Sequence, residues 1–410
     1  MDDVFSTTAQ ESDSVPSTRE AHERQEDQQR PIHLESTAAV TTTTPAPSPR
    51  LRSLDAFRGL VIALMLLVNN IALDTATPLQ LVHAPWHEMV RLADLVFPWF
   101  LLCTGIAIPF SAASYRKRGG PAWRYDLKLL GRCASLVLLG CLIESSLIRH
   151  PLLSLGVLQV IGFAFLIGAW LYDLPLARRL LIAAGLLTAY WAAIKFLPVP
   201  GMNVGILDEQ HNLIWYLNSH FFAGGHFGEL TLSLWGLPSI IPTAALVLIG
   251  TAIGDLLRIT RLHVLTKSLL LIALGITLAW GGFQWNHSLL FSKAIWSPSY
   301  ILLAAGTGTM LLGLFTVAID AWPRVGLWSY PLTVFGANAI LAYVAPILVK
   351  VYILEEWHLS HGQTIEQWGL STLSAHWGPI VGGWSYTGLY MLGWWLILWQ
   401  LYRKRVFIRV

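Results

Sequence analysis

A short polar segment between two apolar stretches carries the residues best suited to chemistry. It runs from residue 81 to residue 94 and contains His83, Glu88 and Asp94. A neutral imidazole can take a proton from an attacking amine or hydroxyl, or act as a nucleophile itself. A fold-back of the segment would bring Asp94 or Glu88 onto the ring and fix its tautomer. We predict a histidine-centred site with Asp94 as orienting partner; the alternatives are a packing role for His83 and a helix-capping role for Asp94.

The elements that must position this segment are membrane-spanning helices. The 410-residue chain is 54% hydrophobic and only 12% charged, about half the charged fraction of soluble domains. Most charges lie between apolar runs of roughly 17 to 22 residues, the length of helix that crosses ~30 Å of hydrocarbon. We predict an all-α fold, a polytopic integral membrane bundle of about ten transmembrane helices. The expected spans are 56–74, 93–113, 127–147, 153–171, 179–197, 236–256, 265–282, 299–319, 331–350 and 381–401.

The basic residues orient this bundle in the membrane. Outside the first 49 residues, nineteen lysines and arginines lie on one side of the predicted spans and five on the other. The positive-inside rule makes the first side cytoplasmic, and an even number of spans then places both termini there. His83 falls on the opposite side, near long outer loops at 198–235, 283–298 and 351–380 that are rich in Trp, His and Gly. We expect a polar, aromatic-lined vestibule on this outer face.

The N-terminal segment indicates the cellular location, and the cysteines and charges exclude several kinds of binding site. Residues 1–49 are rich in Ser, Thr, Glu, Gln and Pro, which predicts a disordered cytoplasmic tail before a transmembrane domain at 50–410. No signal peptide is recognisable in the tail, which favours a bacterial plasma (inner) membrane. Three cysteines inside apolar stretches argue against disulfides and zinc. The histidine-rich loops lack metal-ligand spacing and the basic residues are scattered, so we expect no metal and no nucleic-acid partner.

Polar side chains inside the predicted spans are further candidates. Asn69 ends the first span, and Asn338 lies in the ninth. An amide at that depth is costly unless paired, so both are expected to face the bundle interior. There each would either orient a sugar or carbonyl group or bond to neighbouring backbone. Gln159 is expected to tie helices together, and Glu144 to pair with Arg149 or join the vestibule.

Two arginines lie at the cytoplasmic entrance of the first span. Arg58 follows Asp55 by three residues, so the two share a helix face and can form a local ion pair. Alternatively, Arg52 or Arg58 attracts an anionic cytosolic ligand such as a nucleotide-linked donor. The spacing leaves both interpretations open.

Several short motifs, in order along residues 50 to 350, resemble those of the heparan-α-glucosaminide N-acetyltransferase family. The first motif is quite specific, whereas the later ones would be weak alone. The motifs are Arg50-Leu51-Arg52-Ser53-Leu54-Asp55-Ala56-Phe57-Arg58-Gly59, Val68-Asn69, His83-Ala84-Pro85-Trp86, Ala93-Asp94-Leu95-Val96-Phe97-Pro98-Trp99-Phe100, Gly156-Val157-Leu158-Gln159, Leu237-Pro238-Ser239-Ile240 with Gly250, Trp296-Ser297-Pro298-Ser299-Tyr300 and Gly336-Ala337-Asn338-Ala339-Ile340-Leu341-Ala342-Tyr343-Val344.

The resemblance implies a definite chemistry. The family's animal member passes an acetyl group from cytosolic acetyl-CoA across the membrane to the amine of a terminal glucosamine. The family's active-site histidine falls on His83, and the asparagine ending its first span falls on Asn69. The resemblance therefore implies a membrane acyltransferase with acetyl-CoA as donor substrate, no tightly bound cofactor, and an amino sugar or glycan acceptor on the outer side. Trp86 and Asn338 are the expected additional substrate contacts, and the two arginines of the first span are the expected donor contacts.

Three positions depart from the family pattern. His87-Glu88 contains an apparent insertion, and Val160 replaces the basic residue that follows the G-V-L-Q motif in the family. Ala345-Pro346 stands where the family often has a histidine after the Tyr-Val pair of the ninth span. These changes are compatible with a different donor, a different acceptor or lost catalysis. Two rival classes therefore remain, a transporter for an amino sugar or related solute and a catalytically inactive relative. The acyl chain, the choice between direct transfer and an acyl-histidine intermediate, and a homodimeric assembly also stay open.

Overall fold

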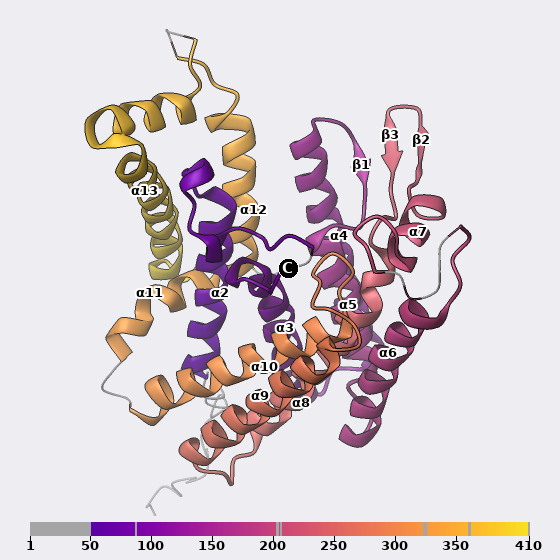
Figure 1. Cartoon of the computed structure of the whole chain (residues 1–410). Coiled ribbons are helices and arrows are strands. Elements are labelled where there is room, and N and C mark those ends of the chain that lie inside the picture. Colours follow the sequence, from indigo (N-terminus) through magenta and orange to yellow (C-terminus); the bar gives the residue numbers. More distant parts are fainter. Residues whose placement is uncertain are drawn as a thin grey trace, which may run out of the picture. The chain divides into compact units, whose positions relative to one another are not determined.

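A computed structural model describes residues 51–408 apart from 87, 202–204, 206, 323–325 and 360–361. The predicted tail at residues 1–49 lies outside the described residues. The described chain is mainly helical, as predicted, and three short strands form a small sheet (Figure 1). The elements are α2 (Arg52–Asn70), α3 (Leu92–Lys117), α4 (Ala122–Ile148), β1 (Leu152–Leu153), α5 (Val157–Leu171), α6 (Leu176–Phe196), α7 (Leu213–His220), β2 (Gly225–Phe227), β3 (Leu230–Leu232), α8 (Ile240–Arg258), α9 (Val264–Asn286), α10 (Pro298–Phe315), α11 (Gly326–Ala337), α12 (Ala339–Val349) and α13 (Ile365–Arg403).

A helix overlaps each of the ten predicted spans, but fewer helices meet the requirements for crossing a bilayer. Among the described residues, six helices are long and apolar enough, and a seventh span is made if a bent pair counts as one. The six are Arg52–Asn70, Leu92–Lys117, Leu176–Phe196, Leu237–Arg258, Val264–Asn286 and Pro298–Ala321. The chain is thus a multi-pass helical protein, and the count of ten stays a prediction for α4, α5 and α13.

The ninth predicted span is a broken helix. Its two parts, Trp328–Ala337 and Ala339–Leu354, are bent by 74°. Asn338 lies at the break with a non-helical backbone (φ −123°, ψ 51°). Its amide donates to the carbonyl of Val406 at 3.1 Å and accepts from the amide of Ile408 at 2.8 Å. These bonds attach the C-terminal segment to the break in the helix.

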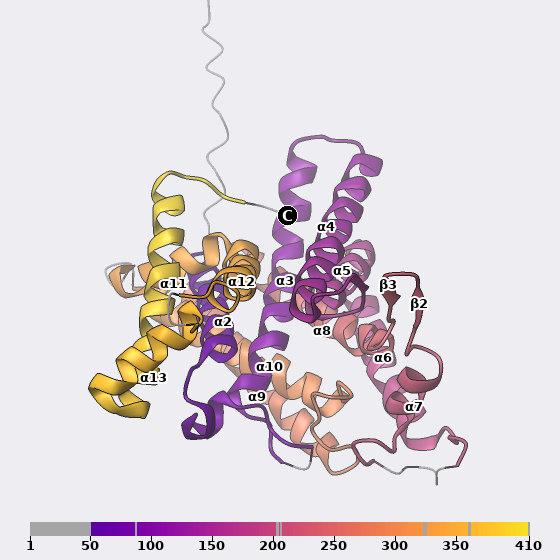
Figure 2. The same cartoon turned by 90° about the horizontal axis from the view of Figure 1, so that it is seen from above.

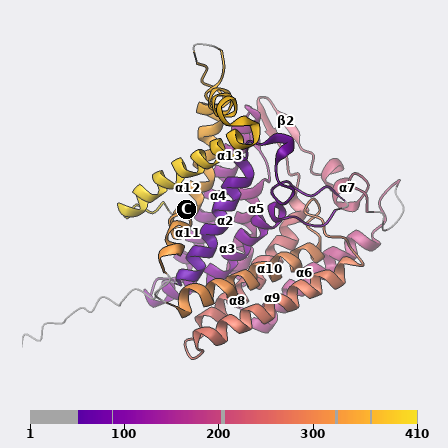
Figure 3. The same ribbon diagram turned by 60° about the vertical axis from the view of Figure 1, so that its left-hand side comes forward.

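Glycines let the central helices approach closely. A Cβ on Gly59 of α2 would lie 1.7 Å from the carbonyl oxygen of Leu332 on α11, and one on Gly250 of α8 would lie 2.8 Å from that of Leu102 on α3. Such contacts place small residues where apolar helices pack backbone to backbone. Figure 1 and Figure 3 show α8, α9 and α10 running together, while α11, α12 and α13 surround the other side of α2.

The small sheet joins the segment that follows α7 to the connection between α4 and α5. Strand β1 pairs in parallel with β3, with Leu152 opposite Thr231, and β3 pairs antiparallel with β2. Figure 2 shows the β2–β3 hairpin near α6 and α7, far from α13. The sheet therefore fixes the segment after α7 against the α4–α5 connection, where it helps to enclose a cavity.

Candidate active site

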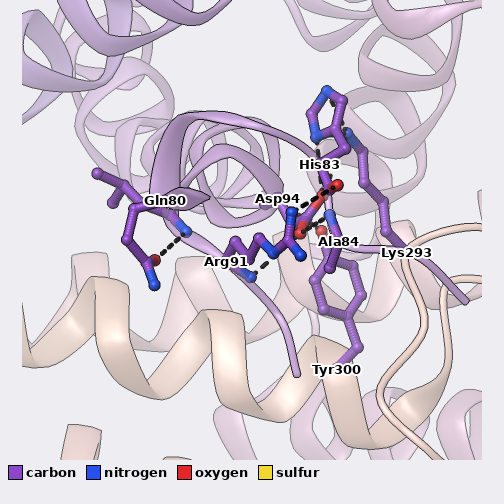
Figure 4. A network of polar contacts seen from close by, with 8 residues as sticks. Gln80, His83, Ala84, Arg91, Asp94, Lys293 and Tyr300 are labelled. Atoms are coloured by element: carbon purple, nitrogen blue, oxygen red, sulfur yellow. Dashed lines mark hydrogen bonds and ion pairs between the residues drawn. The ribbon is translucent and has the colours of Figure 1, made fainter. Parts of the chain in front are cut away.

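The start of α3 holds the predicted histidine segment in place. Asp94 is the third residue of the helix, and its Oδ2 accepts the backbone amide of Arg91 at 3.1 Å, a capping bond. The amide of Leu92 donates to Oε1 of Gln80 at 3.1 Å. These bonds satisfy amides that an α-helix leaves without partners at its N-terminus. As a result, residues 80–86 and 88–91 fold back onto the first turn of α3 (Figure 4).

The fold-back brings His83 onto Asp94, as the sequence predicted. Nδ1 of His83 lies 2.8 Å from Oδ1 of Asp94, and the amide of Ala84 donates to Oδ2 at 3.1 Å. An ionised carboxylate can only accept hydrogen bonds, so Nδ1 carries a proton; in the neutral form of the ring Nε2 then keeps its lone pair. The Asp94 side chain is 3% exposed, whereas the His83 side chain is 53% exposed. The pair therefore joins a buried, fixed carboxylate to an accessible imidazole.

The other predicted carboxylate has a different partner. Glu88 forms an ion pair with Arg91. Arg91 also donates to the carbonyl of His83 at 3.2 Å. Glu88 therefore stiffens the loop through Arg91, and Asp94 is the carboxylate that contacts the ring.

Lys293, which the sequence did not single out, completes the cluster. Its Nζ lies 3.1 Å from Nδ1 and 3.2 Å from Nε2 of His83, and 3.8 Å from Oδ1 of Asp94 (Figure 4). Burial lowers the pKa of Lys293 below its ordinary value, while the charge of Asp94 opposes the shift. One carboxylate thus faces two basic side chains.

Aromatic residues beside Lys293 fix the loop that carries it. The hydroxyl of Tyr300, a fully buried residue of α10, donates to the backbone carbonyl of Asp94 at 2.6 Å. The ring of Trp296 packs edge-on against Phe97 and Tyr300, at centroid distances of 5.1 and 5.8 Å. These contacts join the loop before α10 to α3. Two sequence signals pointed to this loop, the motif from Trp296 to Tyr300 and the inclusion of residues 283–298 among the loops expected near His83, but neither singled out Lys293.

The cluster opens into a cavity of about 510 Å³, here called the histidine cavity. This volume lies within the range of roughly 300–1,000 Å³ typical of small-ligand sites. Val160, which occupies the position of the expected basic residue, lines it, so the departure falls inside the site. Trp86 also lines it and donates from Nε1 to the carbonyl of Leu207 at 3.0 Å. Further lining residues include Asp94, Glu209, Ser239, Lys293 and Trp296.

Asn69 lines a different cavity. This second cavity of about 380 Å³, here called the amide cavity, is lined by Asn69, Asn70, Glu144, Gln159, Tyr343 and Lys350, among others. Val157 lines both cavities. Asn69, which the resemblance assigned to the same site as His83, is therefore separated from it by the first turn of α5.

The remaining predicted residues lie elsewhere. Arg52 and Arg58 lie at the start of α2, whereas Asn69 lies at its end. Arg58 forms the local ion pair with Asp55 at 2.9 Å and donates from Nε to the carbonyl of Gly336 at 2.9 Å. Asn338 contributes to neither cavity, because its amide binds the C-terminal segment.

The other two departures from the family pattern have different locations. Pro346 lies within α12 and accepts a hydrogen bond at its carbonyl from the hydroxyl of Tyr390, at 2.9 Å. His87 lies outside the described residues.

Fold and site together define a class, a multi-pass helical membrane protein with a carboxylate-oriented histidine facing a cavity. Within this class the chain belongs to the heparan-α-glucosaminide N-acetyltransferase family, because the profile of that family's catalytic region matches residues 50–291. The resemblance seen in the motifs is thus confirmed. Lys293 and Tyr300 lie just beyond the matched range.

Two relatives show how far the similarity extends. The chain is 26% identical over 430 residues to heparan-alpha-glucosaminide N-acetyltransferase of Homo sapiens. It is 25% identical over 427 residues to the protein of the same name of Mus musculus. Each alignment covers 88% of this chain but only 60% of the relative. The chain therefore spans about 60% of the length of these relatives.

Proposed function

We propose that this protein is a membrane acyltransferase that moves an acetyl group from cytosolic acetyl-CoA to the amine of an amino sugar or glycan on the other side of the membrane. The observation that carries the proposal is the His83–Asp94 pair at the histidine cavity. The family supports the reaction type, since its named relatives are N-acetyltransferases of a glucosaminide.

The geometry supports His83 as the group that handles the proton. With Nδ1 bound to Asp94, Nε2 faces Nζ of Lys293 at 3.2 Å. Once the bound substrates draw Lys293 to the carbonyl oxygen of the donor, the lone pair of Nε2 can accept a proton from the amine as its nitrogen attacks the thioester carbon. The new C–N bond forms, the C–S bond breaks, and the imidazolium returns a proton to the departing CoA sulfur. In a two-step variant, Nε2 itself attacks the thioester and the C–S bond breaks to release CoA as its thiolate. The amine then takes the acetyl group from the acyl-imidazole, the N–C bond to Nε2 breaks, and the proton lost by the amine neutralises the thiolate.

Lys293 is suited to the charge that develops in either route. Its Nζ lies 3.2 Å from Nε2, close enough to reach the carbonyl oxygen of a donor that binds beside the ring as that oxygen becomes negative. A fixed cation at a developing oxyanion stabilises the transition state more than the ground state. Trp86 is a candidate contact for the apolar face of a sugar in the same cavity.

The arrangement along α2 is compatible with substrates that enter from opposite sides. Arg52 at the start of the helix and Asn69 at its end are separated by roughly 25 Å at 1.5 Å per residue. Arg58 is held by Asp55 and Gly336, which leaves the exposed Arg52 as the better donor contact. The distribution of basic residues supports a cytoplasmic location for the start of α2. Ten spans, both termini in the cytoplasm and a bacterial inner membrane are parts of the same proposal.

A sided assay in proteoliposomes tests this function. Labelled acetyl-CoA is supplied on the Arg52 side and glucosamine on the His83 side, and labelled N-acetylglucosamine is measured. A second arm measures entry of labelled glucosamine without acetyl-CoA. The proposal expects product only when both substrates are present on their respective sides. Sugar entry without any acetylated product would instead identify a transporter, and neither product nor entry would identify an inactive relative.

A further inference from the structure

The amide cavity has polar groups that the fold does not use. Gln159 is fully buried, and its Oε1 has no hydrogen-bond partner among the described residues. Its Nε2 makes only long contacts, 3.5 Å to Oγ of Ser154 and 3.7 Å to Sγ of Cys141. A buried polar atom without a partner is costly, and in native proteins it calls for an explanation such as a bound ligand.

A carboxylate in the same cavity lacks a cation. Glu144 bonds to the hydroxyl of Ser154, and no salt bridge to it is present in the described part of the chain. Lys350, the basic residue of the lining, is engaged by Glu355 at 3.9 Å and by Glu366 at 3.3 Å. Glu144 is therefore available to a cation that enters the cavity.

The other unused groups match a hydroxylated ligand. The exposed amide of Asn69 makes no hydrogen bond to another described residue, and it faces the cavity together with the phenol of Tyr343. Gln159 and Glu144 offer acceptors, whereas Asn69 and Tyr343 can both donate and accept. A ligand that satisfies this set carries an ammonium group and several hydroxyls.

We propose that the amide cavity is a separate binding site for a hydroxylated amine, which the acceptor amino sugar occupies as its ammonium ion before it reaches His83. The identification of this amine with the acceptor rests on the proposed function; the binding site itself does not. Glu144 receives the ammonium group, and Oε1 of Gln159 accepts a hydroxyl or N–H of the ligand.

The first turn of α5 separates this site from the histidine cavity. Gly156 lines the histidine cavity, Gln159 lines the amide cavity, and Val157 lines both. A Cβ at Gly156 would lie 1.3 Å from Oε1 of Glu144, so only glycine allows the carboxylate to pack against this turn. The partition is therefore a single turn thick, and the ligand passes Val157 to move from one cavity to the other.

Equilibrium binding of labelled glucosamine to the purified full chain tests the site without any turnover. Wild type is compared with Glu144→Gln, which keeps the shape and removes the charge, and with Gln159→Met, which removes the unpaired oxygen. Glu356→Gln is the matched control, since Glu356 pairs with Arg149 and is not part of the cavity lining. His83→Ala alters the histidine cavity alone and so shows which of the two cavities binds glucosamine. Competition by unlabelled N-acetylglucosamine, which has no ammonium group, shows whether binding needs that group.

We expect saturable binding to wild type, His83→Ala and Glu356→Gln. The Kd should rise by about tenfold or more in Glu144→Gln, as for the loss of one charge-assisted hydrogen bond, and by a smaller factor in Gln159→Met, which loses one hydrogen bond to a neutral acceptor. N-acetylglucosamine should compete poorly. Gln159→Met should melt at the same or a higher temperature than wild type, because it removes an unsatisfied buried oxygen. If Gln159→Met does not fold, the binding measured for Glu144→Gln alone tests the site. Binding that is lost in His83→Ala but unchanged in both cavity variants, or no saturable binding to wild type, would overturn the proposal.

Acetyl transfer measured on the same variants separates the two proposals. Binding through Glu144 and Gln159 without any transfer would leave this site in place and remove the enzyme function. Transfer with an unchanged KM for glucosamine in both variants would retain the enzyme and remove this site.

Discussion

Replacing Asp94 by asparagine changes two atoms of the site and should reverse the direction of one hydrogen bond. The carbonyl oxygen of the new amide can take the place of Oδ2 and still accept the amides of Ala84 and Arg91. The amide nitrogen then faces Nδ1 of His83, where it can only donate. The ring must therefore carry its proton on Nε2, so the lone pair that the mechanism needs points toward residue 94 and away from the substrate.

The size of the effect follows from these contacts. General-base catalysis contributes about 10²–10⁴ in rate, which corresponds to roughly 3–5 kcal/mol of barrier. The two backbone bonds lose charge assistance, worth about 1 kcal/mol each, so we expect the unfolding free energy to fall by about 2 kcal/mol. The KM for glucosamine should change little, because the side chain of Asp94 is buried behind His83.

Initial rates of acetyl transfer in proteoliposomes measure this prediction, with thermal unfolding followed by tryptophan fluorescence on the same samples. Asp173→Asn is the matched control, because Asp173 forms an exposed ion pair with Arg116 far along the sequence from the site. Exposed pairs contribute about 0–1 kcal/mol, so this control should retain wild-type rates and nearly wild-type stability.

Two results would refute the reasoning about Asp94. A folded Asp94→Asn variant with a kcat close to wild type would show that the tautomer of His83 does not matter to the reaction. A rise in KM at constant kcat would assign Asp94 to substrate binding instead of orientation.

Two further substitutions test the cation at the site and the helix packing behind it. The pKa of Lys293 is lowered in the folded protein, so folding disfavours the charged form of this side chain and lowers the stability. The whole loss of stability is present at a pH below the folded-state pKa, and it disappears as the pH rises to the ordinary pKa of lysine, about 10.4. Lys293→Met should therefore melt higher than wild type near neutral pH, with an advantage that shrinks toward pH ~10.4; an advantage that grows with pH would contradict the sign. Gly59→Ala should lower the melting temperature, at a cost of roughly 1–3 kcal/mol, since its Cβ would lie 1.7 Å from the carbonyl oxygen of Leu332. Gly185→Ala on α6 should leave the melting temperature unchanged, because the space around its Cβ is open. An equal fall in the melting temperature of both variants would argue against the close α2–α11 contact.

Local patterns in the sequence were sufficient to locate the helices and the central pair of the site. Apolar runs of spanning length carry their own signal, so a helix occurs at every predicted span. His83 and Asp94 are eleven residues apart, and the expected fold-back of the polar segment anticipated their contact. Asp94 also makes the capping contact at the start of α3 that the sequence offered as the alternative.

Features that depend on contacts between distant segments could not be predicted in this way. Lys293 is 210 positions from His83, and only the packing of Trp296 and Tyr300 against α3 brings it there. The attachment of the C-terminal segment to the bend at Asn338 is another such contact. Asn69 was assigned to the site of His83 through the family resemblance, yet the two residues line separate cavities on either side of the first turn of α5.

Chemical rescue at position 83 tests the central claim most directly. The His83 side chain is 53% exposed and faces a cavity of about 510 Å³, so free imidazole can enter the space left by His83→Ala. The account predicts that His83→Ala loses acetyl transfer by about 10²-fold or more and that added imidazole restores part of the rate in this variant only. A folded His83→Ala protein that transfers acetyl groups at nearly the wild-type rate without imidazole would contradict the account.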